Sequence, residues 1–221
     1  YNRLAGILNL WAGEEKEDSL VLLAALAEMR RFADYDYTVT AITIDSGLGD
    51  SSQFDCIGDF CLSLDVEYKI VKTDIAEIVF GVRKEENPCS LCAKLRRGAL
   101  HNTAEELGCT ALALGHHMDD VIETMMLALI YEGRFCSFWP VTYLEKTGLT
   151  VIRPLIFVPE ADIKGFERKS LLPCAKNPCP LDGSTKREYV KTLLKQLNND
   201  NPGVRKRLFH AITEGNLEGW S

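Results

Sequence analysis

Three cysteines are the residues of this sequence whose types and spacing predict the most specific chemistry. Cys89 and Cys92 form a close pair, Cys179 lies much later, and both sites directly follow an Asn-Pro dipeptide. Thiolates bind iron–sulfur clusters and also zinc, so either metal centre is an interpretation of this pattern. A four-iron cluster held by only three thiolates would have one open iron, which could hold sulfide or a substrate.

The remaining cysteines have other interpretations. Cys174 lies five residues before Cys179 and could compete with it as the third ligand, but the Asn-Pro-Cys-Pro context favours Cys179. Cys174 then becomes a candidate catalytic or persulfide-carrying thiol, or a buried side chain. At this length and with no secretion signal, reduced cysteines in a cytoplasmic protein are favoured over a disulfide scaffold. Four cysteines in apolar segments are predicted to fill the core: Cys56, Cys61, Cys109 and Cys136.

A second polar cluster follows an apolar run. Gly115 is followed by His116 and His117, and then by Asp119 and Asp120. Two carboxylates at the start of a helix can simply complement its dipole. Two histidines and two aspartates exceed what a cap requires, and carboxylate oxygens are ligands that Mg²⁺ prefers. We therefore expect a functional site here.

Strands and helices alternate through the first two thirds of the chain. The expected strands are Ile7–Ala12, Tyr37–Ile44, Val66–Val71, Thr110–Leu114 and Thr150–Ile152. The expected helices between them are Asp18–Phe32, Ser52–Leu64, Ser90–Leu107 and Met118–Tyr131. This alternation predicts an α/β fold with a doubly wound, parallel, five-stranded sheet. Ligands bind such sheets beyond the carboxyl ends of the strands, so residues 12–18, 45–49 and 115–120 should converge. Asp45 should then lie near a bound ligand, or else only start a turn.

After Pro159 only helices are expected, over Glu160–Leu171, Ser184–Leu197 and Pro202–Thr213. We therefore divide the chain into an α/β domain, 1–158, and a helical C-terminal segment, 159–221. The formal net charge is −7, yet eleven Lys and Arg face only six Asp and Glu between Glu160 and His210. A basic face on an acidic body is typical of a phosphate-backbone contact, although solvated helices would look the same. No apolar run is long enough to predict a membrane span.

The segment Leu114–Thr124 resembles the second motif of the N-type ATP pyrophosphatase (PP-loop) superfamily, whose fold is that of the adenine nucleotide alpha hydrolases (HUP). Three further segments resemble the tRNA 2-thiocytidine synthetase (TtcA) family: Pro88–Gly98, Val151–Leu155 and Asn177–Gly183. Together they cover nearly the whole chain in a specific order and spacing.

The resemblance implies an ATP-dependent tRNA thiolase. Such enzymes adenylate the C2 oxygen of a tRNA cytidine, because a carbonyl oxygen leaves poorly and AMP leaves well, and sulfide then displaces AMP. The implied cofactors are a 4Fe-4S cluster held by Cys89, Cys92 and Cys179, ATP and Mg²⁺. The implied partners are tRNA, a sulfur donor (a cysteine desulfurase or inorganic sulfide) and, as is common in the family, a second copy of the chain.

The resemblance also implies site residues. Catalytic roles are expected for Asp18, Asp120 and Cys174. Nucleotide and Mg²⁺ binding are expected for six residues: Ser19, Asp45, Gly115, His116, His117 and Asp119.

The first superfamily motif differs in this chain. The superfamily has Ser-Gly-Gly-x-Asp-Ser, whose bare backbone N–H groups hold ATP phosphates. Here Gly13-Glu14-Glu15-Lys16-Glu17 precedes Asp18-Ser19. Carboxylates repel a triphosphate, and Glu lacks the conformational freedom of glycine. The loop is either degenerate in an ATP-independent relative, altered by engineering, or shortened by a stretch missing from the sequence.

Two other functions stay open at this stage. One is an ATP-independent 4Fe-4S enzyme that handles sulfur on the same fold, such as a desulfidase or a sulfur carrier. The other is a non-catalytic module that binds a nucleotide or carries zinc on the cysteines. Iron content after anaerobic purification separates the zinc module from both enzymes.

Overall fold

The computed structural model describes residues 2–7, 15–83, 88–170, 172–173, 179, 181 and 185–215. Cys174 lies outside the described residues, as do residues 8–12 of the first expected strand. That strand was placed too late, because β1 spans Asn2–Ile7 and pairs with β2 from Asn2 opposite Tyr37 to Ile7 opposite Ile42. The strand begins with the polar residues Asn2 and Arg3, so an apolar pattern does not mark its start.

The sheet has the predicted doubly wound, parallel arrangement. Its strands are β1 (Asn2–Ile7), β2 (Tyr37–Asp45), β3 (Glu67–Lys72), β4 (Ala111–Ala113), β5 (Val141–Leu144) and β6 (Leu149–Ile152). Among the described residues their order is β3-β2-β1-β4-β6-β5. Five strands run parallel, which confirms the expected fold, and β5 adds an antiparallel edge.

The edge strand β5 was not predicted. It forms a hairpin with β6 through a turn in which Gly148 has φ of +67°. Val141 and Tyr143 on β5 are 59% and 64% exposed, as expected for a strand with one solvated face. A four-residue strand of this kind is too short for its alternating pattern to be distinguished from a loop.

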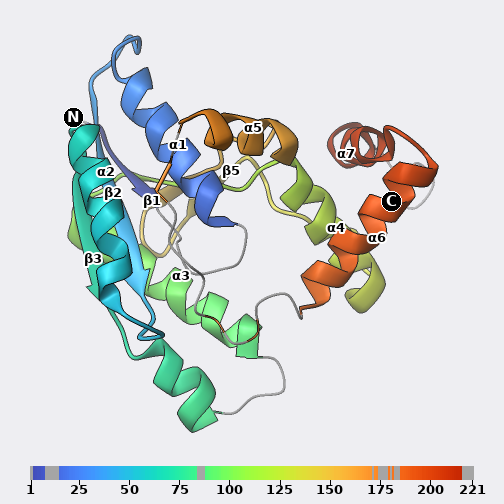
Figure 1. Cartoon of the computed structure of the whole chain (residues 1–221), viewed down its shortest axis with the longest axis horizontal. Helices are drawn as coiled ribbons and strands as arrows, with labels where there is room; N and C mark the ends of the chain where they lie inside the picture. Colours follow the sequence, from blue (N-terminus) through green and yellow to red (C-terminus); the bar gives the residue numbers. More distant parts are fainter. Residues whose placement is uncertain are drawn as a thin grey trace.

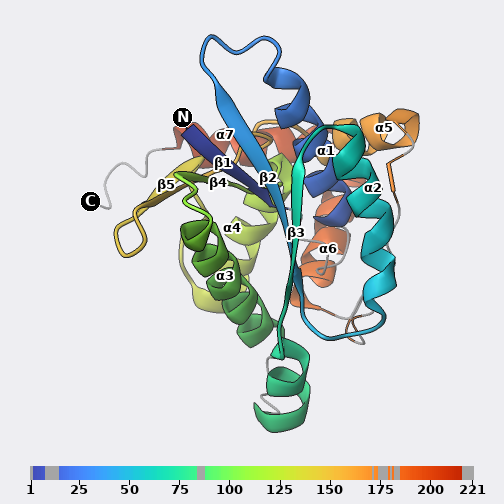
Figure 2. The ribbon, with the colours of Figure 1, turned by 90° about the vertical axis from the view of Figure 1, so that its left-hand side faces the viewer.

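Helices cover both faces of the sheet (Figure 2). They are α1 (Glu15–Met29), α2 (Asp55–Ser63) after the 3₁₀ turn η1 (Ser51–Phe54), the π-helix η2 (Glu77–Arg83), α3 (Pro88–Glu106), α4 (Met118–Glu132), α5 (Glu160–Ser170), α6 (Lys186–Asp200) and α7 (Val204–Glu214). Leucines of α1, Phe54 at the end of η1 and Ile57 of α2 form one core with the sheet. Leu100 and Ala104 of α3 form a second core with Ile42 and other strand residues on the opposite face.

A third, smaller core joins α4 to the C-terminal helices. Met118 and Ile122 of α4 are buried with Val190 and Leu194 of α6, and Phe209 of α7 packs against them. Figure 1 shows α4, α6 and α7 grouped beside one another, away from strands β1–β3. The division at residue 158 stays a prediction, and α4 is the element that both parts share. No helix among the described residues is long and apolar enough to cross a membrane.

Candidate active site

The ends of β1 and β4 form the switch point of the sheet, where ligands of doubly wound folds bind. Gly115 follows β4 and lies against the start of α1. A Cβ on Gly115 would lie 3.0 Å from the backbone nitrogen of Ser19 and 3.1 Å from the carbonyl carbon of Asp18. Only glycine permits this approach without moving the backbone. The structure therefore brings together three predicted site residues: Asp18, Ser19 and Gly115.

His117 links α1 to α4 inside the protein. It caps α4 in a reciprocal box, in which the His117 N–H donates to Asp120 Oδ2 at 3.0 Å and the Asp120 N–H donates to His117 Nδ1 at 3.4 Å. The other ring nitrogen, Nε2, lies 3.5 Å from Asp18 Oδ2. Because His117 is only 2% exposed, we infer that it holds these two carboxylates in place.

The charge on His117 follows from these contacts. Burial lowers its pKa, but the carboxylates of Asp18 and Asp120 outweigh burial and raise the pKa to about 9. When His117 is protonated, Nδ1 has no lone pair and no longer accepts the long bond from the Asp120 N–H. The charged ring is instead paired with the carboxylates of Asp18 and Asp120. His117 is thus positively charged near neutral pH, between two predicted catalytic carboxylates.

Stability is therefore expected to fall as pH rises from 7 to 9. The folded state retains the His117 proton in this range and the unfolded state, with a pKa near 6.5, has lost it, so unfolding becomes easier as pH increases. The shift corresponds to roughly 3 kcal/mol of unfolding free energy. Urea titrations across this range check it. His117→Gln should flatten the profile, and the exposed control His210→Gln should leave it unchanged. Equal slopes in all three proteins would contradict the assignment.

Asp119 faces the C-terminal helices. Its Oδ2 accepts a hydrogen bond of 2.8 Å from the backbone N–H of Glu160, and its Oδ1 is paired with Arg205 of α7. Asp120 Oδ1 and Glu123 Oε2 lie 3.4 Å and 3.1 Å from Nη1 of Arg187 on α6. Sequence reasoning missed both arginines. Asp119, predicted to bind nucleotide or Mg²⁺, and Asp120, predicted to be catalytic, thus also anchor the helices that follow the sheet.

Glu123 is the most deeply buried of these carboxylates. Burial raises its pKa to about 7, against the opposing charges of Lys191 and Arg187. Its Oε1 has no hydrogen-bond partner within the described part of the chain. The anchor between α4 and α6 therefore includes a carboxyl group that can gain or lose a proton near neutral pH.

Replacing Arg205 by Gln is expected to lower the free energy of unfolding by about 2–3 kcal/mol, because it leaves the buried Asp119 carboxylate without its cation. Arg207→Gln is the matched control. Arg207 is an exposed neighbour that bonds only oxygens of Asn201 and Pro202, so its loss should change stability by less than about 0.5 kcal/mol. Chemical denaturation measures both. Equal values for the two variants would mean that the Asp119 pair adds nothing.

Two other predicted residues are placed less centrally. Asp45 ends β2, and its Oδ1 accepts a hydrogen bond of 2.9 Å from the Gly47 N–H, so it starts a turn as well as lying at the carboxyl edge of the sheet. His116 packs its ring against Phe138 at 4.7 Å between centroids. Their roles toward a nucleotide stay predictions.

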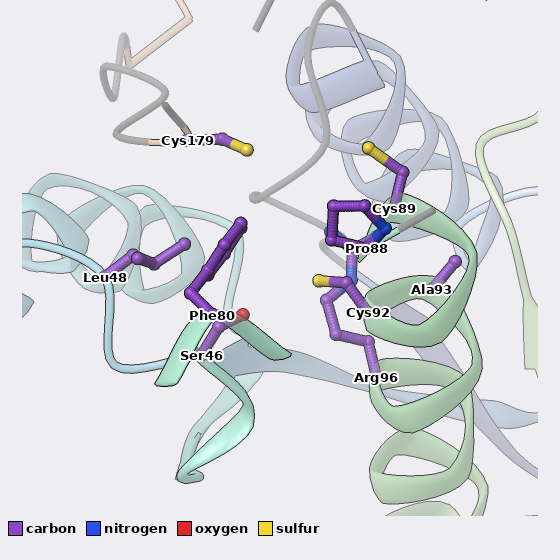
Figure 3. A pocket seen from close by; sticks show the side chains of 9 residues that line it. All are labelled: Ser46, Leu48, Phe80, Pro88, Cys89, Cys92, Ala93, Arg96 and Cys179. Atoms are coloured by element: carbon purple, nitrogen blue, oxygen red, sulfur yellow. The ribbon is translucent and has the colours of Figure 1, made fainter. Parts of the chain in front are cut away.

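The three predicted cysteine ligands meet in one pocket, although Cys179 comes from a distant part of the chain. We call this the cysteine pocket, and it is lined by Ser46, Leu48, Phe80, Pro88, Cys89, Cys92, Ala93, Arg96 and Cys179. Figure 3 shows Cys89 and Cys92 on the first turns of α3, with the sulfur of Cys179 facing them from the other side. Ser46 directly follows β2, so the pocket lies at the same sheet edge as Asp45.

Electrostatics in the cysteine pocket favour a positively charged occupant. Burial raises the pKa of Cys89 and Cys92, and the neighbouring Cys179 raises both further. Arg96 opposes the shift at Cys92. A thiolate at Cys89 or Cys92 is therefore disfavoured unless a cation compensates its charge. A metal centre bound by sulfur would do so, which is why the donor set fits one.

Zinc and iron–sulfur centres make different demands on their cysteine ligands. Across the described residues, no three His, Cys, Asp or Glu side chains are arranged to hold a single metal ion. One zinc ion would need every sulfur at about 2.3 Å from the same atom, whereas each thiolate of an iron–sulfur cluster binds a different iron. Three cysteine thiols are a donor set that an iron–sulfur cluster accepts. A Mg²⁺ site at the carboxyl edge of the sheet does not require three protein ligands, since Mg²⁺ is usually held by one or two carboxylates together with substrate phosphates.

The basic C-terminal face is smaller than its composition suggested. Four of its cations make internal ion pairs: Lys164, Arg187, Lys191 and Arg205. Six are exposed: Arg168, Lys169, Lys186, Lys195, Lys206 and Arg207. The exposed set, which we call the basic face, lies on α5, α6 and α7.

Comparison with known proteins gives one consistent answer. The PP-loop domain family matches residues 16–197. A tRNA-cytidine(32) 2-sulfurtransferase of Citrifermentans bemidjiense is 38% identical over 200 residues, covering 89% of this chain and 78% of the relative. The enzyme of the same name from Geobacter sulfurreducens is 36% identical over 205 residues, covering 91% and 79%.

A solved structure agrees over the whole fold. The U34-tRNA thiolase NcsA from Methanococcus maripaludis, solved with its [4Fe-4S] cluster, matches with a TM-score of 0.77 and 27% identity, covering 96% of this chain and 72% of that one. With its sheet order, its Gly115–Asp120 segment and these relatives, the chain belongs to the PP-loop family and, within it, to the tRNA-cytidine(32) 2-sulfurtransferases.

Proposed function

We propose that this protein replaces the C2 oxygen of a tRNA cytidine with sulfur, using ATP, Mg²⁺ and a 4Fe-4S cluster. The observation that carries the proposal is the meeting of Cys89, Cys92 and Cys179 in one pocket beside the carboxyl end of β2. The names of the relatives support cytidine 32 as the substrate nucleotide. The cluster in the NcsA structure supports iron over zinc.

Adenylation of the cytidine would take place at the switch point of the sheet, where β1 and β4 end. Asp18 and Ser19 at the start of α1 lie against Gly115, where the phosphates of ATP would meet backbone N–H groups. Asp18 and Asp120, both within 3.6 Å of His117 Nε2, would hold Mg²⁺ against those phosphates. Adenylation turns the cytidine oxygen into part of a good leaving group, AMP.

Delivery of sulfur to the adenylated base would take place at the cysteine pocket. Cys89, Cys92 and Cys179 would ligate the cluster, and three ligands leave one iron without a protein donor. When bound, the cluster would supply a sulfur nucleophile at that iron. The apolar walls formed by Leu48, Phe80 and Ala93 would keep water from competing for the activated base.

Partners follow from the same proposal. The basic face would contact the tRNA backbone, and its exposed cations make that contact sensitive to salt. Sulfur would come from a cysteine desulfurase or from inorganic sulfide. We expect a cytoplasmic homodimer, and Cys174 is proposed as a second functional thiol.

One observation favours a different function. Glu14, Glu15 and Glu17 stand where the superfamily places its phosphate loop, and α1 begins at Glu15. An ATP-independent 4Fe-4S enzyme that handles sulfur, a desulfidase or a sulfur carrier, would not need that loop. It predicts iron in the protein without pyrophosphate release.

The experiment uses anaerobically reconstituted protein, unmodified tRNA, ATP and sulfide, followed by digestion of the tRNA to nucleosides. We expect 2-thiocytidine, with one pyrophosphate released per thiolated base. Thiolated uridine in its place would move the substrate to another tRNA position. Iron without any ATP-dependent product would favour the ATP-independent function, and zinc without iron would overturn both.

A further inference from the structure

Two polar groups in the cysteine pocket lack partners. Among the described residues, neither Ser46 Oγ nor Arg96 Nε has a hydrogen-bond partner, and both atoms are buried. Ser46 is 1% exposed and Arg96 is 8% exposed. A buried group that gives up water without a new partner costs free energy, so two such groups beside one cavity require an explanation.

Both groups line the same cavity as the three sulfurs. Ser46 comes from the end of β2 and Arg96 from α3, one helical turn after Cys92. Figure 3 shows the Arg96 side chain extending from α3 past Cys92 toward Pro88, and Ser46 beside Phe80. Two donors from separate elements therefore face the space that the thiols enclose.

The chemistry of the two donors defines the ligand. A guanidinium N–H can only donate a hydrogen bond, and a serine hydroxyl can also donate one. The ligand must therefore accept hydrogen bonds, and the positive charge of Arg96 favours an anion. The other pocket walls are apolar or sulfur, which suits a small, soft ion better than a sugar or a carboxylate.

We propose that Ser46 and Arg96 are the donors of a binding site for hydrosulfide in the cysteine pocket, which orients this anion beside the metal centre. This inference rests on the proposed function, because it assumes a cluster on the three cysteines. Arg96 would also offset the charge that a further anion adds next to three thiolates. Both residues are positioning residues, since they would orient the hydrosulfide through hydrogen bonds and would not contact the nucleotide.

The test is an anaerobic titration of reconstituted protein with sodium hydrosulfide, without tRNA or ATP, followed by electron paramagnetic resonance of the reduced cluster. Arg96→Gln should weaken hydrosulfide binding at least 10-fold, and Ser46→Ala about 5-fold, with iron content unchanged. Matched controls are the exposed neighbour Arg97→Gln and the exposed serine Ser63→Ala, which should bind like the parent.

The outcomes separate this inference from the proposed function. If the parent holds iron and binds hydrosulfide but both variants bind it equally well, the inference is wrong and the function stands. If both variants lose iron while the controls keep it, the two residues support the metal centre and not the anion, which also overturns the inference. A parent that takes up no iron refutes the function itself.

Discussion

Cys179→Ala is expected to purify anaerobically with less than about one iron atom per chain, whereas the parent holds about four. The substitution removes the thiol that faces Cys89 and Cys92 across the cysteine pocket. The two remaining thiols lie on the same turns of α3, so a cluster would be held from one side only. Formation of 2-thiocytidine should fall below detection with it.

Cys136→Ala is the matched control. Its thiol is exposed, so the prediction that Cys136 fills the core was wrong: it lies in the segment after α4 and outside the cysteine pocket, and its Sγ is 3.9 Å from the carbonyl oxygen of Ser137. It should retain iron and activity, and denaturation curves for both variants would show that the fold is intact. Iron equal to that of the parent in Cys179→Ala would refute the third ligand and return Cys174 to consideration.

The parts of the site that could be predicted from sequence are those whose residues are neighbours in the chain. Cys89 and Cys92 are separated by one helical turn, and Gly115–Asp120 is a single run after a buried strand. Cys179 was found only because its Asn-Pro context repeats that of Cys89. For these residues a local pattern was sufficient, because the chemistry and the backbone geometry are specified together.

The contacts that could not be predicted join distant residues. Arg205 reaches Asp119 across 86 positions, and Arg187 reaches Glu123 across 64. Nothing near either arginine in sequence distinguishes it from Arg207, which is exposed. Their pairing depends on how α6 and α7 pack on α4, and that is decided by the small apolar core around Val190 and Leu194. The count of eleven Lys and Arg between Glu160 and His210 therefore overstated the positive charge available to a ligand.

The strongest test of ATP use is to restore the phosphate loop. The combined change Glu14→Ser, Glu15→Gly and Lys16→Gly gives the superfamily motif directly before Asp18-Ser19. We expect ATP to bind at least about 1,000-fold more tightly, as measured by calorimetry. Two backbone N–H groups bonded to phosphate contribute about 1.5–3 kcal/mol each, and removing a close carboxylate adds about 1 kcal/mol.

The loop variant should bind ATP more tightly because its three substitutions lie at the start of α1. Helix N-termini attract anions, and α1 begins at Glu15. Three glutamates at positions 14, 15 and 17 bring negative charge close to this end of the helix in sequence, and negative charge repels a triphosphate. Glycines leave backbone N–H groups open to a phosphate and cost about 1 kcal/mol each in helix propensity, so the variant should bind ATP better while it unfolds more easily.

The control is Glu28→Ser, which removes an exposed carboxylate at the far end of α1 and should leave ATP affinity unchanged. Pyrophosphate release during thiolation then separates the two functions. If the restored loop tightens ATP binding and speeds pyrophosphate release together, this edge of the sheet is the adenylation site. If both proteins thiolate tRNA at the same rate with and without ATP, adenylation is not part of the reaction, and the sulfur chemistry depends on the cysteine pocket alone.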